Sequence, residues 1–205
     1  MRSISLLLLL AMVSCNGWIN KPLFERLDPS YTGVDFGVKV IENDSLNMLT
    51  FTNFYTGSGV GIGDINNDGF SDIYFGSCME SGRLYLNKGN MQFEDITTLA
   101  GIETNSWITG VTMIDINTDG FLDIYLNVSG PLSQHNTRNL LFINNGDITF
   151  EEQAAKYGID DPSQTTHSSF FDYDKDGDLD LFMAINPSDT SINLMGNLHA
   201  MNKRQ

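Results

Sequence analysis

The chain has 205 residues, with 26 acidic and 11 basic side chains and a formal net charge of −15. This length is sufficient for one domain with a real hydrophobic core. The acidic balance, with no basic stripe along the chain, excludes a nucleic-acid-binding role.

Residues 1–14 have the composition of a secretory signal peptide. A single positive charge at Arg2 is followed by an apolar run and by the small residue Ser14, directly before Cys15. The run is too short to span a membrane permanently. Because a cysteine follows the small residue, the segment resembles a bacterial lipobox, and cleavage before Cys15 would leave that residue as a lipid anchor. The alternative is an ordinary signal peptide with a chance cysteine.

Residues 15–56 are expected to hold the lipidated N-terminus, a linker and a ring-closing strand. The stretch around Phe24 mirrors the later stretches around Phe93 and Phe150, each of which ends a repeat. The N-terminal stretch therefore has the character of a last strand whose earlier partners lie elsewhere. If Cys15 carries lipid, Cys78 is left as a thiol without a disulfide partner, and we expect it to be a small buried hydrophobe rather than a nucleophile.

One motif, D-x-[DN]-x-D-G-x-x-D, occurs three times, at residues 64–72, 115–123 and 172–180. Oxygen-bearing side chains at the first, third, fifth and ninth positions, with a glycine at the sixth, suit calcium, which takes six to eight oxygen ligands. The seventh residue would give its backbone carbonyl. The predicted ligands of up to three calcium ions are Asp64, Asn66, Asp68, Phe70 and Asp72; Asp115, Asn117, Asp119, Phe121 and Asp123; and Asp172, Asp174, Asp176, Asp178 and Asp180.

The residues around these loops decide which kind of calcium loop is present. An EF-hand needs a glutamate at the twelfth position, which here holds Phe75, Leu126 and Met183. Dockerin-like loops lie on helices, whereas these loops are flanked by short β-branched and aromatic runs. Such runs on both sides of a tight turn predict a β-hairpin.

The spacing of the hairpins predicts an all-β fold. Residues 57–104 and 105–160 each contain four strand-like runs, and residues 161–205 contain the hairpin of a third, incomplete unit. Four strands in about fifty residues is the period of a β-propeller blade, and parallel β-helix calcium repeats recur much faster. We therefore expect a partial β-propeller of about two and a half four-stranded antiparallel blades, with the remaining blades supplied by a longer parent chain.

At these loops, and at the Phe75-Gly76 pair after the first, the sequence resembles the FG-GAP/VCBS repeat family. These are calcium-binding propeller repeats like those in the head of integrin α subunits, and the resemblance covers residues 57–190. The pair is replaced by Leu126-Asn127 and Met183-Ala184 in the later repeats. The opening of the chain, from Leu23 to residues 42–47, further resembles Bacteroidetes-type surface lipoproteins. The resemblance implies a structural or adhesive propeller without shared catalytic residues.

No catalytic constellation stands out. The glycines at 57, 59, 61 and 63 are expected to serve close strand packing, since no Walker lysine and no helix follow them. His135, His167 and His199 lack zinc-ligand spacing. Trp107, at the entrance of the second repeat, is a candidate for an exposed sugar-stacking side chain, whereas Tyr74, Tyr85 and Tyr125 are expected in the core.

These observations favour a non-enzymatic binding module at a cell surface. We expect it to be secreted, attached to a bacterial outer membrane only through its lipid, and to present loops to a protein or glycan partner. The alternative is a non-catalytic part of a polysaccharide-degrading or glycan-uptake system. A lyase or hydrolase built on a propeller rim is a third possibility, which the residues support little.

Overall fold

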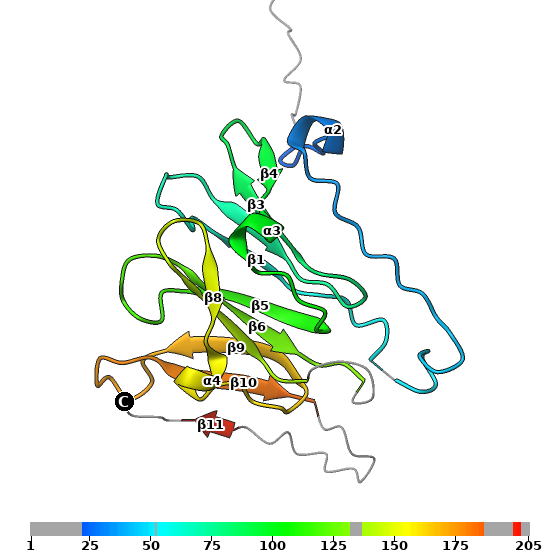
Figure 1. Ribbon diagram of the computed structural model, residues 1–205, viewed down its shortest axis with the longest axis vertical. Coiled ribbons are helices and arrows are strands. Elements are labelled where there is room, and N and C mark those ends of the chain that lie inside the picture. Colours follow the sequence, from blue (N-terminus) through cyan, green and yellow to red (C-terminus); the bar gives the residue numbers. More distant parts are fainter. Residues whose placement is uncertain (1–21, 52, 132–136, 187–198, 202–205) are drawn as a thin grey trace, which may run out of the picture.

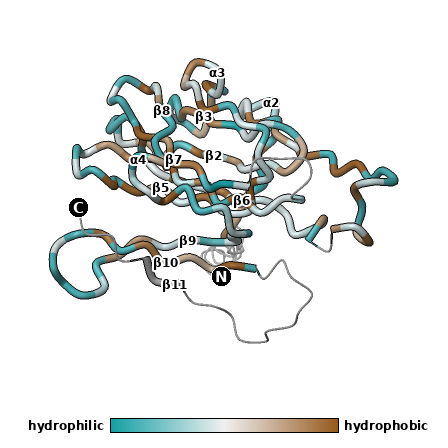
Figure 2. The backbone as a smooth tube through the Cα atoms, turned by 60° about the horizontal axis from the view of Figure 1, so that its bottom comes forward, coloured by the Kyte–Doolittle hydropathy of each residue, from teal (hydrophilic) through white to brown (hydrophobic). Residues whose placement is uncertain are grey.

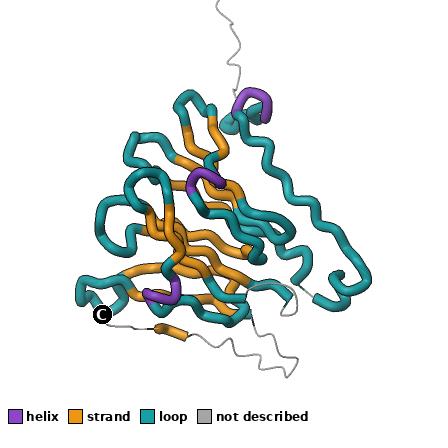
Figure 3. The backbone as a smooth tube through the Cα atoms, viewed as in Figure 1, coloured by secondary structure: helices purple, strands orange, loops and turns teal. Residues whose placement is uncertain are grey.

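The computed structural model describes residues 22–51, 53–131, 137–186 and, for the backbone, 199–201. The signal peptide, Cys15 and His135 lie outside these residues. The described chain folds into three antiparallel sheets stacked one upon the next (Figure 1). This confirms the expected all-β, partial propeller of four-stranded blades, and strands dominate the core in Figure 3. No helix in these ranges is long and apolar enough to cross a membrane.

Each sheet is a meander in which consecutive strands pair. The first contains β1 (Val60–Gly63), β2 (Asp72–Phe75), β3 (Arg83–Asn87) and β4 (Phe93–Asp95). The second contains β5 (Ile108–Ile114), β6 (Asp123–Val128), β7 (Leu140–Asn144) and β8 (Phe150–Glu152). The third contains β9 (Thr165–Phe171), β10 (Asp180–Ile185) and β11 (His199–Met201). The short helices are α2 (Pro29–Thr32), α3 (Thr97–Ala100) and α4 (Ala154–Tyr157).

The sheets contact one another through their first strands, with β5 between β1 and β9. The contact between β1 and β5 is close because Gly59 and the glycines of β1 turn their bare side toward β5. A Cβ added to Gly59 would lie 2.6 Å from the Val111 nitrogen, and one added to Gly61 would lie 2.7 Å from the Val111 Cγ1. The glycine run therefore serves strand packing, as predicted, although Gly57 has open space around it.

The opposite side of β1 is not covered in the same way. Val60 and Ile62 alternate with the glycines and are 50% and 66% exposed. The residues at the same repeat positions in β5 are Val111 and Met113, and they pack against the glycines of β1. Val60 and Ile62 of the first sheet therefore face outward, whereas the equivalent side chains of the second sheet pack against the first sheet.

Two apolar cores fill the spaces between the sheets. Tyr74, Ile108 and Leu126 belong to the core between the first and second sheets, whereas Tyr125 and Met183 belong to the core between the second and third. The Tyr125 hydroxyl donates to the Ile159 carbonyl at 2.9 Å. Tyr74, Tyr85 and Tyr125 are all buried, as predicted. Apolar residues follow the strands in Figure 2, and the loop between β9 and β10 is hydrophilic.

Each short helix follows one of the three similar stretches noted in the sequence. Each ends at a glycine in the left-handed region, namely Gly33, Gly101 and Gly158. Helices α3 and α4 follow the fourth strands of their sheets, and α2 follows the stretch around Phe24. That stretch forms no strand within the described residues, and Phe24 is 85% exposed. Its ring-closing role therefore stays a prediction.

The expectation that Trp107 is exposed was wrong. Its side chain is only 1% exposed, because Phe51 and Phe54 cover it with ring centroids at 5.3 and 5.8 Å. Cys78 is buried in the same cluster, as predicted, and burial raises the pKa of its thiol. The N-terminal segment before β1 thus supplies the aromatic cover that the sequence did not reveal.

We expect Gly59→Ala to destabilise the protein by roughly 1–3 kcal/mol, because the added methyl group meets the β5 backbone rather than a movable side chain. Gly37→Ala is the control, since a Cβ there meets nothing within 4 Å. Urea unfolding followed by tryptophan fluorescence measures both. Equal midpoints for the two variants would contradict the close packing of β1 on β5.

Candidate metal centres in three hairpin loops

The three acidic loops connect the first two strands of each sheet. The strands pair up to the edge of each loop, with Gly63 opposite Asp72, Ile114 opposite Asp123 and Phe171 opposite Asp180. The loops lie along one edge of the stack, on the left of Figure 1. They are therefore strand hairpins, as predicted, and no helix flanks them.

All three loops have the same backbone conformation. The sixth-position glycine has a positive φ in each, at 88° for Gly69, 92° for Gly120 and 95° for Gly177. The fourth position is also left-handed, with φ of 59°, 58° and 63° at Asn67, Thr118 and Lys175. Threonine and lysine rarely adopt this conformation, so the shape is imposed by the loop rather than by local preference. The sequence predicted a left-handed residue only at the glycine. At the fourth position, only Asn67 is of a residue type that favours a positive φ.

The same hydrogen bonds turn the acidic side chains inward. The carboxylate of the first residue accepts from the backbone N–H of the sixth, at 2.7 Å for Asp64, 2.9 Å for Asp115 and 3.2 Å for Asp172. The fifth-position carboxylate accepts from the seventh N–H, at 2.8 Å for Asp68 and Asp119. These bonds hold the first and fifth carboxylates of the first two loops against the backbone of the same turn.

The phenylalanine rings at the seventh position of the first two loops pack against another turn of the same sheet. A Cβ added to Gly89 would lie 3.5 Å from the Phe70 ring, and one added to Gly146 would lie 3.2 Å from the Phe121 ring. Each phenylalanine therefore covers the glycine turn between the third and fourth strands of its own sheet. The third loop has Asp178 instead, which is exposed.

The ninth aspartate connects each loop to its sheet. Asp72 accepts from the Ile65 and Asn87 N–H groups at 2.9 and 2.7 Å, and Asp123 accepts from the equivalent pair at 3.0 and 2.8 Å. Both side chains are fully buried. Burial, and then the charges of the neighbouring loop aspartates, raise the pKa of Asp72 and Asp123. A cation in the loop would offset this cost of ionisation.

The third loop has the most concentrated carboxylates. Asp172, Asp174 and Asp176 each offer an oxygen within 4.8 Å of the others. Two oxygens bound to one calcium ion at 2.3–2.6 Å are separated by at most about 5 Å, so this donor set fits that ion. Desolvation and the charges of Asp176 and Asp180 raise the pKa of Asp174. Hydrogen bonding with Asp176, desolvation and nearby charges raise the pKa of Asp178.

The first two loops have an asparagine in place of the third-position aspartate. The Asn66 amide donates to Asp68 at 3.0 Å, and the Asn117 amide donates to Asp119 at 2.8 Å. Each amide therefore bridges to a carboxylate of its own loop, and the third and fifth positions are in contact. The structure thus brings together the side chains predicted at the first, third and fifth positions.

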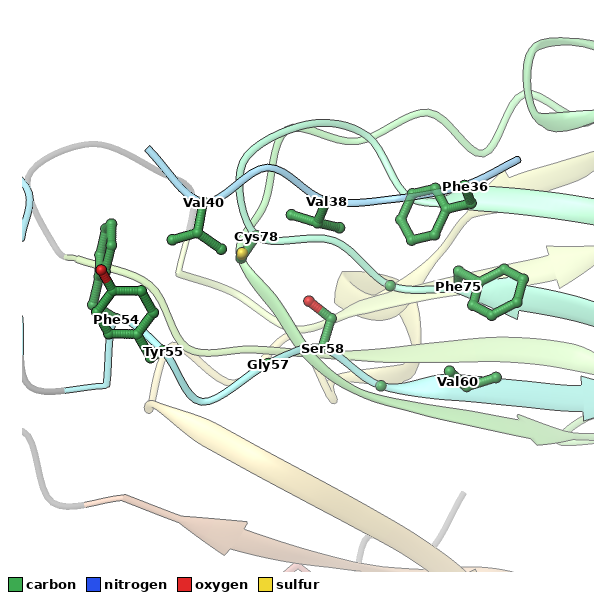
Figure 4. A pocket seen from close by; sticks show the side chains of 12 residues that line it. Phe36, Val38, Val40, Phe54, Tyr55, Gly57, Ser58, Val60, Phe75 and Cys78 are labelled. Atoms are coloured by element: carbon green, nitrogen blue, oxygen red, sulfur yellow. The ribbon is translucent and has the colours of Figure 1, made fainter. Parts of the chain in front are cut away.

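A separate apolar pocket of about 290 Å³ lies between the N-terminal segment and the first sheet. Figure 4 shows Phe36 and Phe75 at one end, Phe54 and Tyr55 at the other, and Cys78 between them. The rings of Phe36 and Phe75 stack with centroids 5.3 Å apart. No carboxylate lines this pocket, so it lacks the donors that calcium prefers. His167, on β9, is exposed, as expected for a surface histidine.

We expect Asp72→Ala to destabilise the protein by about 2–4 kcal/mol even in a chelator, because two buried N–H groups lose their acceptor. The exposed Asp44→Ala should change stability by less than about 0.5 kcal/mol. Urea unfolding in EDTA measures both variants. If Asp72→Ala mattered only when calcium is present, the carboxylate would be a ligand without the structural role described above.

Comparison with known proteins adds to this geometry. A family model for FG-GAP-like repeats matches residues 64–126 and 129–183. The chain is 30% identical over 174 residues to cartilage acidic protein 1 of Xenopus tropicalis, covering 82% of this chain and 25% of the relative. The Mus musculus and Homo sapiens proteins of that name are 28% and 27% identical over 160 residues, covering 77% of this chain and 24% and 23% of theirs. The chain thus spans about a quarter of the length of these curated relatives. Since the two matched segments span more than half of the sequence and begin at the first acidic loop, the chain belongs to the FG-GAP-like repeat family.

Proposed function

We propose that this chain is a calcium-stabilised FG-GAP propeller segment that acts as a structural or adhesive binding module. The observation that carries the proposal is the backbone shape and the aspartate–glycine hydrogen bond that the three loops share. In each of them the backbone is left-handed at the fourth and sixth positions, and the first aspartate is held by the glycine N–H. Loops that serve only as turns have no need for this shared arrangement of carboxylates.

Calcium would act as a staple between paired strands. Each loop holds three or more carboxylates in a small volume, and these repel one another when no cation is present. The residues that would hold the ion are the predicted ligands of each loop, and the bound ion supplies a divalent positive charge. Because the ninth aspartate is also bonded to the third strand of the first two sheets, ordering the loop would order three strands together. Metal binding would thereby contribute to folding free energy.

Thermal unfolding in calcium and in EDTA tests the staple. A ligand present at one hundred times its dissociation constant stabilises a protein by about 2.7 kcal/mol per site, so we expect a midpoint higher in calcium by several degrees. The triple variant Asp68→Ala, Asp119→Ala and Asp176→Ala should lose this difference. Equal midpoints for the unaltered protein would overturn the calcium proposal.

We further propose that the chain is exported and held at a bacterial cell envelope through lipid on Cys15. Support comes from the sequence of residues 1–15, in which a short apolar run ends in a small residue and a cysteine. A single acyl chain gives only weak membrane binding, and stable attachment needs a second anchoring element or a second chain. The module would then project its loops from the membrane surface toward its partner.

Detergent-phase partitioning of cells expressing the chain tests this anchor. The unaltered protein should enter the detergent phase, and mass spectrometry should find a mature N-terminus at a lipid-modified Cys15. The Cys15→Ala variant should remain in the aqueous phase or keep its leader. Recovery of the unaltered protein as a soluble product cut at another residue would favour the ordinary signal peptide.

We propose that the partner is a protein or a glycan at the cell surface. The net charge of −15 disfavours strongly acidic partners, because they would be repelled at long range. Trp107 is buried and offers no sugar-stacking face, which weakens the case for a glycan site at the start of the second blade. A glycan array probed in calcium buffer separates the two partner classes.

A further inference from the structure

Asn144, at the end of β7, connects two of the acidic loops. Its side-chain amide donates to the Leu122 carbonyl at 3.1 Å, within the second loop, and to the Ile65 carbonyl at 2.8 Å, within the first loop. Its backbone N–H donates to Asp123 at 2.8 Å. The side chain is only 2% exposed, so water does not compete effectively for these bonds.

The contacts of Asn144 are next to predicted ligands in both loops. Ile65 lies between Asp64 and Asn66, and Leu122 directly precedes Asp123. A movement of either ligand set therefore moves a carbonyl that the same amide holds. This connection is different from ordinary packing, because a buried amide that loses one acceptor is left unsatisfied.

The first sheet contains the same asparagine without the connection between loops. Asn87 ends β3, donates its N–H to Asp72 at 2.7 Å and its amide to the Ser71 carbonyl at 2.9 Å. Both acceptors belong to the first loop. The two asparagines thus share every local role, and only Asn144 reaches the loop of a neighbouring sheet. This pair supplies a matched control within one chain.

A second bridge joins the same two loops at the surface. The Asn67 amide donates to the Gly120 carbonyl at 2.9 Å. Asn67 is the left-handed fourth residue of the first loop, and Gly120 is the left-handed sixth residue of the second loop. The two positions that give each loop its shape are therefore in direct contact across the interface between sheets.

We propose that the Asn144 and Asn67 amides couple the first and second loops, so that calcium bound in one raises the calcium affinity of the other. This inference rests on the proposed calcium binding and adds its regulation. Calcium in the second loop restricts the motion of Asp123 and Gly120. Asn144, which is bonded to Asp123, then restricts Ile65, and the bond from Asn67 to Gly120 restricts Asn67. The first loop then loses less conformational freedom when it binds its own ion, which produces positive cooperativity.

A site-resolved calcium titration of the full chain tests the coupling. With ¹⁵N-glycine labelling, the amide signals of Gly69 and Gly120 report the first and second loops separately. Asp119→Ala should prevent binding in the second loop and weaken binding in the first by about fivefold, a size typical of coupling between sites. In the Asn144→Ala background, the same Asp119→Ala change should weaken the first loop by less than about twofold, because the buried bridge is absent.

Two further variants complete the design. Asn87→Ala should leave the response of the first loop to Asp119→Ala at its original size, because the Asn144 bridge is intact. Asn67→Gly removes the surface bridge and keeps a residue that tolerates a positive φ. It should reduce the coupling while preserving the fold, so it serves as the test if Asn144→Ala does not fold.

The outcomes separate the coupling from calcium binding itself. If neither glycine signal of the unaltered protein responds to calcium, both the proposed function and the coupling are overturned. If both loops bind calcium but Asp119→Ala leaves the first loop unchanged, the coupling alone is overturned. If the first loop responds fully to Asp119→Ala in both bridge variants, the route through Asn144 and Asn67 is overturned.

Discussion

The buried carboxylate at the ninth position of the first and second acidic loops is the interaction on which the arrangement of the first two blades depends. Asp72 and Asp123 each accept two backbone N–H groups, one from the start of the loop and one from the third strand. A single side chain therefore fixes the hairpin turn and the position of the strand beside it. Replacing either aspartate with an apolar residue would leave two donors buried without a partner.

The hairpins could be predicted from the sequence because their signals are local. Short β-branched and aromatic runs on both sides of a loop with a fixed glycine define two strands and a turn, and repetition of that unit defines the blade. The predicted hairpins lie where the structure has them, since each acidic loop connects the first two strands of its sheet. In the same way, Tyr74, Tyr85 and Tyr125 were predicted to be in the core because they lie within strand-like runs, and all three are buried.

Features that depend on distant residues could not be predicted in this way. From the sequence, Trp107 was interpreted as an exposed residue at the start of a repeat, but in the structure Phe51 and Phe54 of the N-terminal segment cover it. Asn144 reads as an ordinary turn residue, and its bond to Ile65, 79 residues away, exists only because two sheets stack. The left-handed Thr118 and Lys175 go against the local preference of their residue types and follow from the loop's hydrogen bonds.

Glycines alternate with large side chains along the first strand of the first sheet, and this alternation makes the two ends of the stack different. Val111 and Met113 of the second sheet fill the space that Gly61 and Gly63 leave open, and Val60 and Ile62 project outward on the first sheet. Two such outward faces cannot interdigitate with each other, because their large side chains would clash. At the other end, Phe171 occupies the repeat position of Gly63 and is 43% exposed. A sheet added there would need a small residue opposite that ring, so the two ends of the stack demand different neighbours.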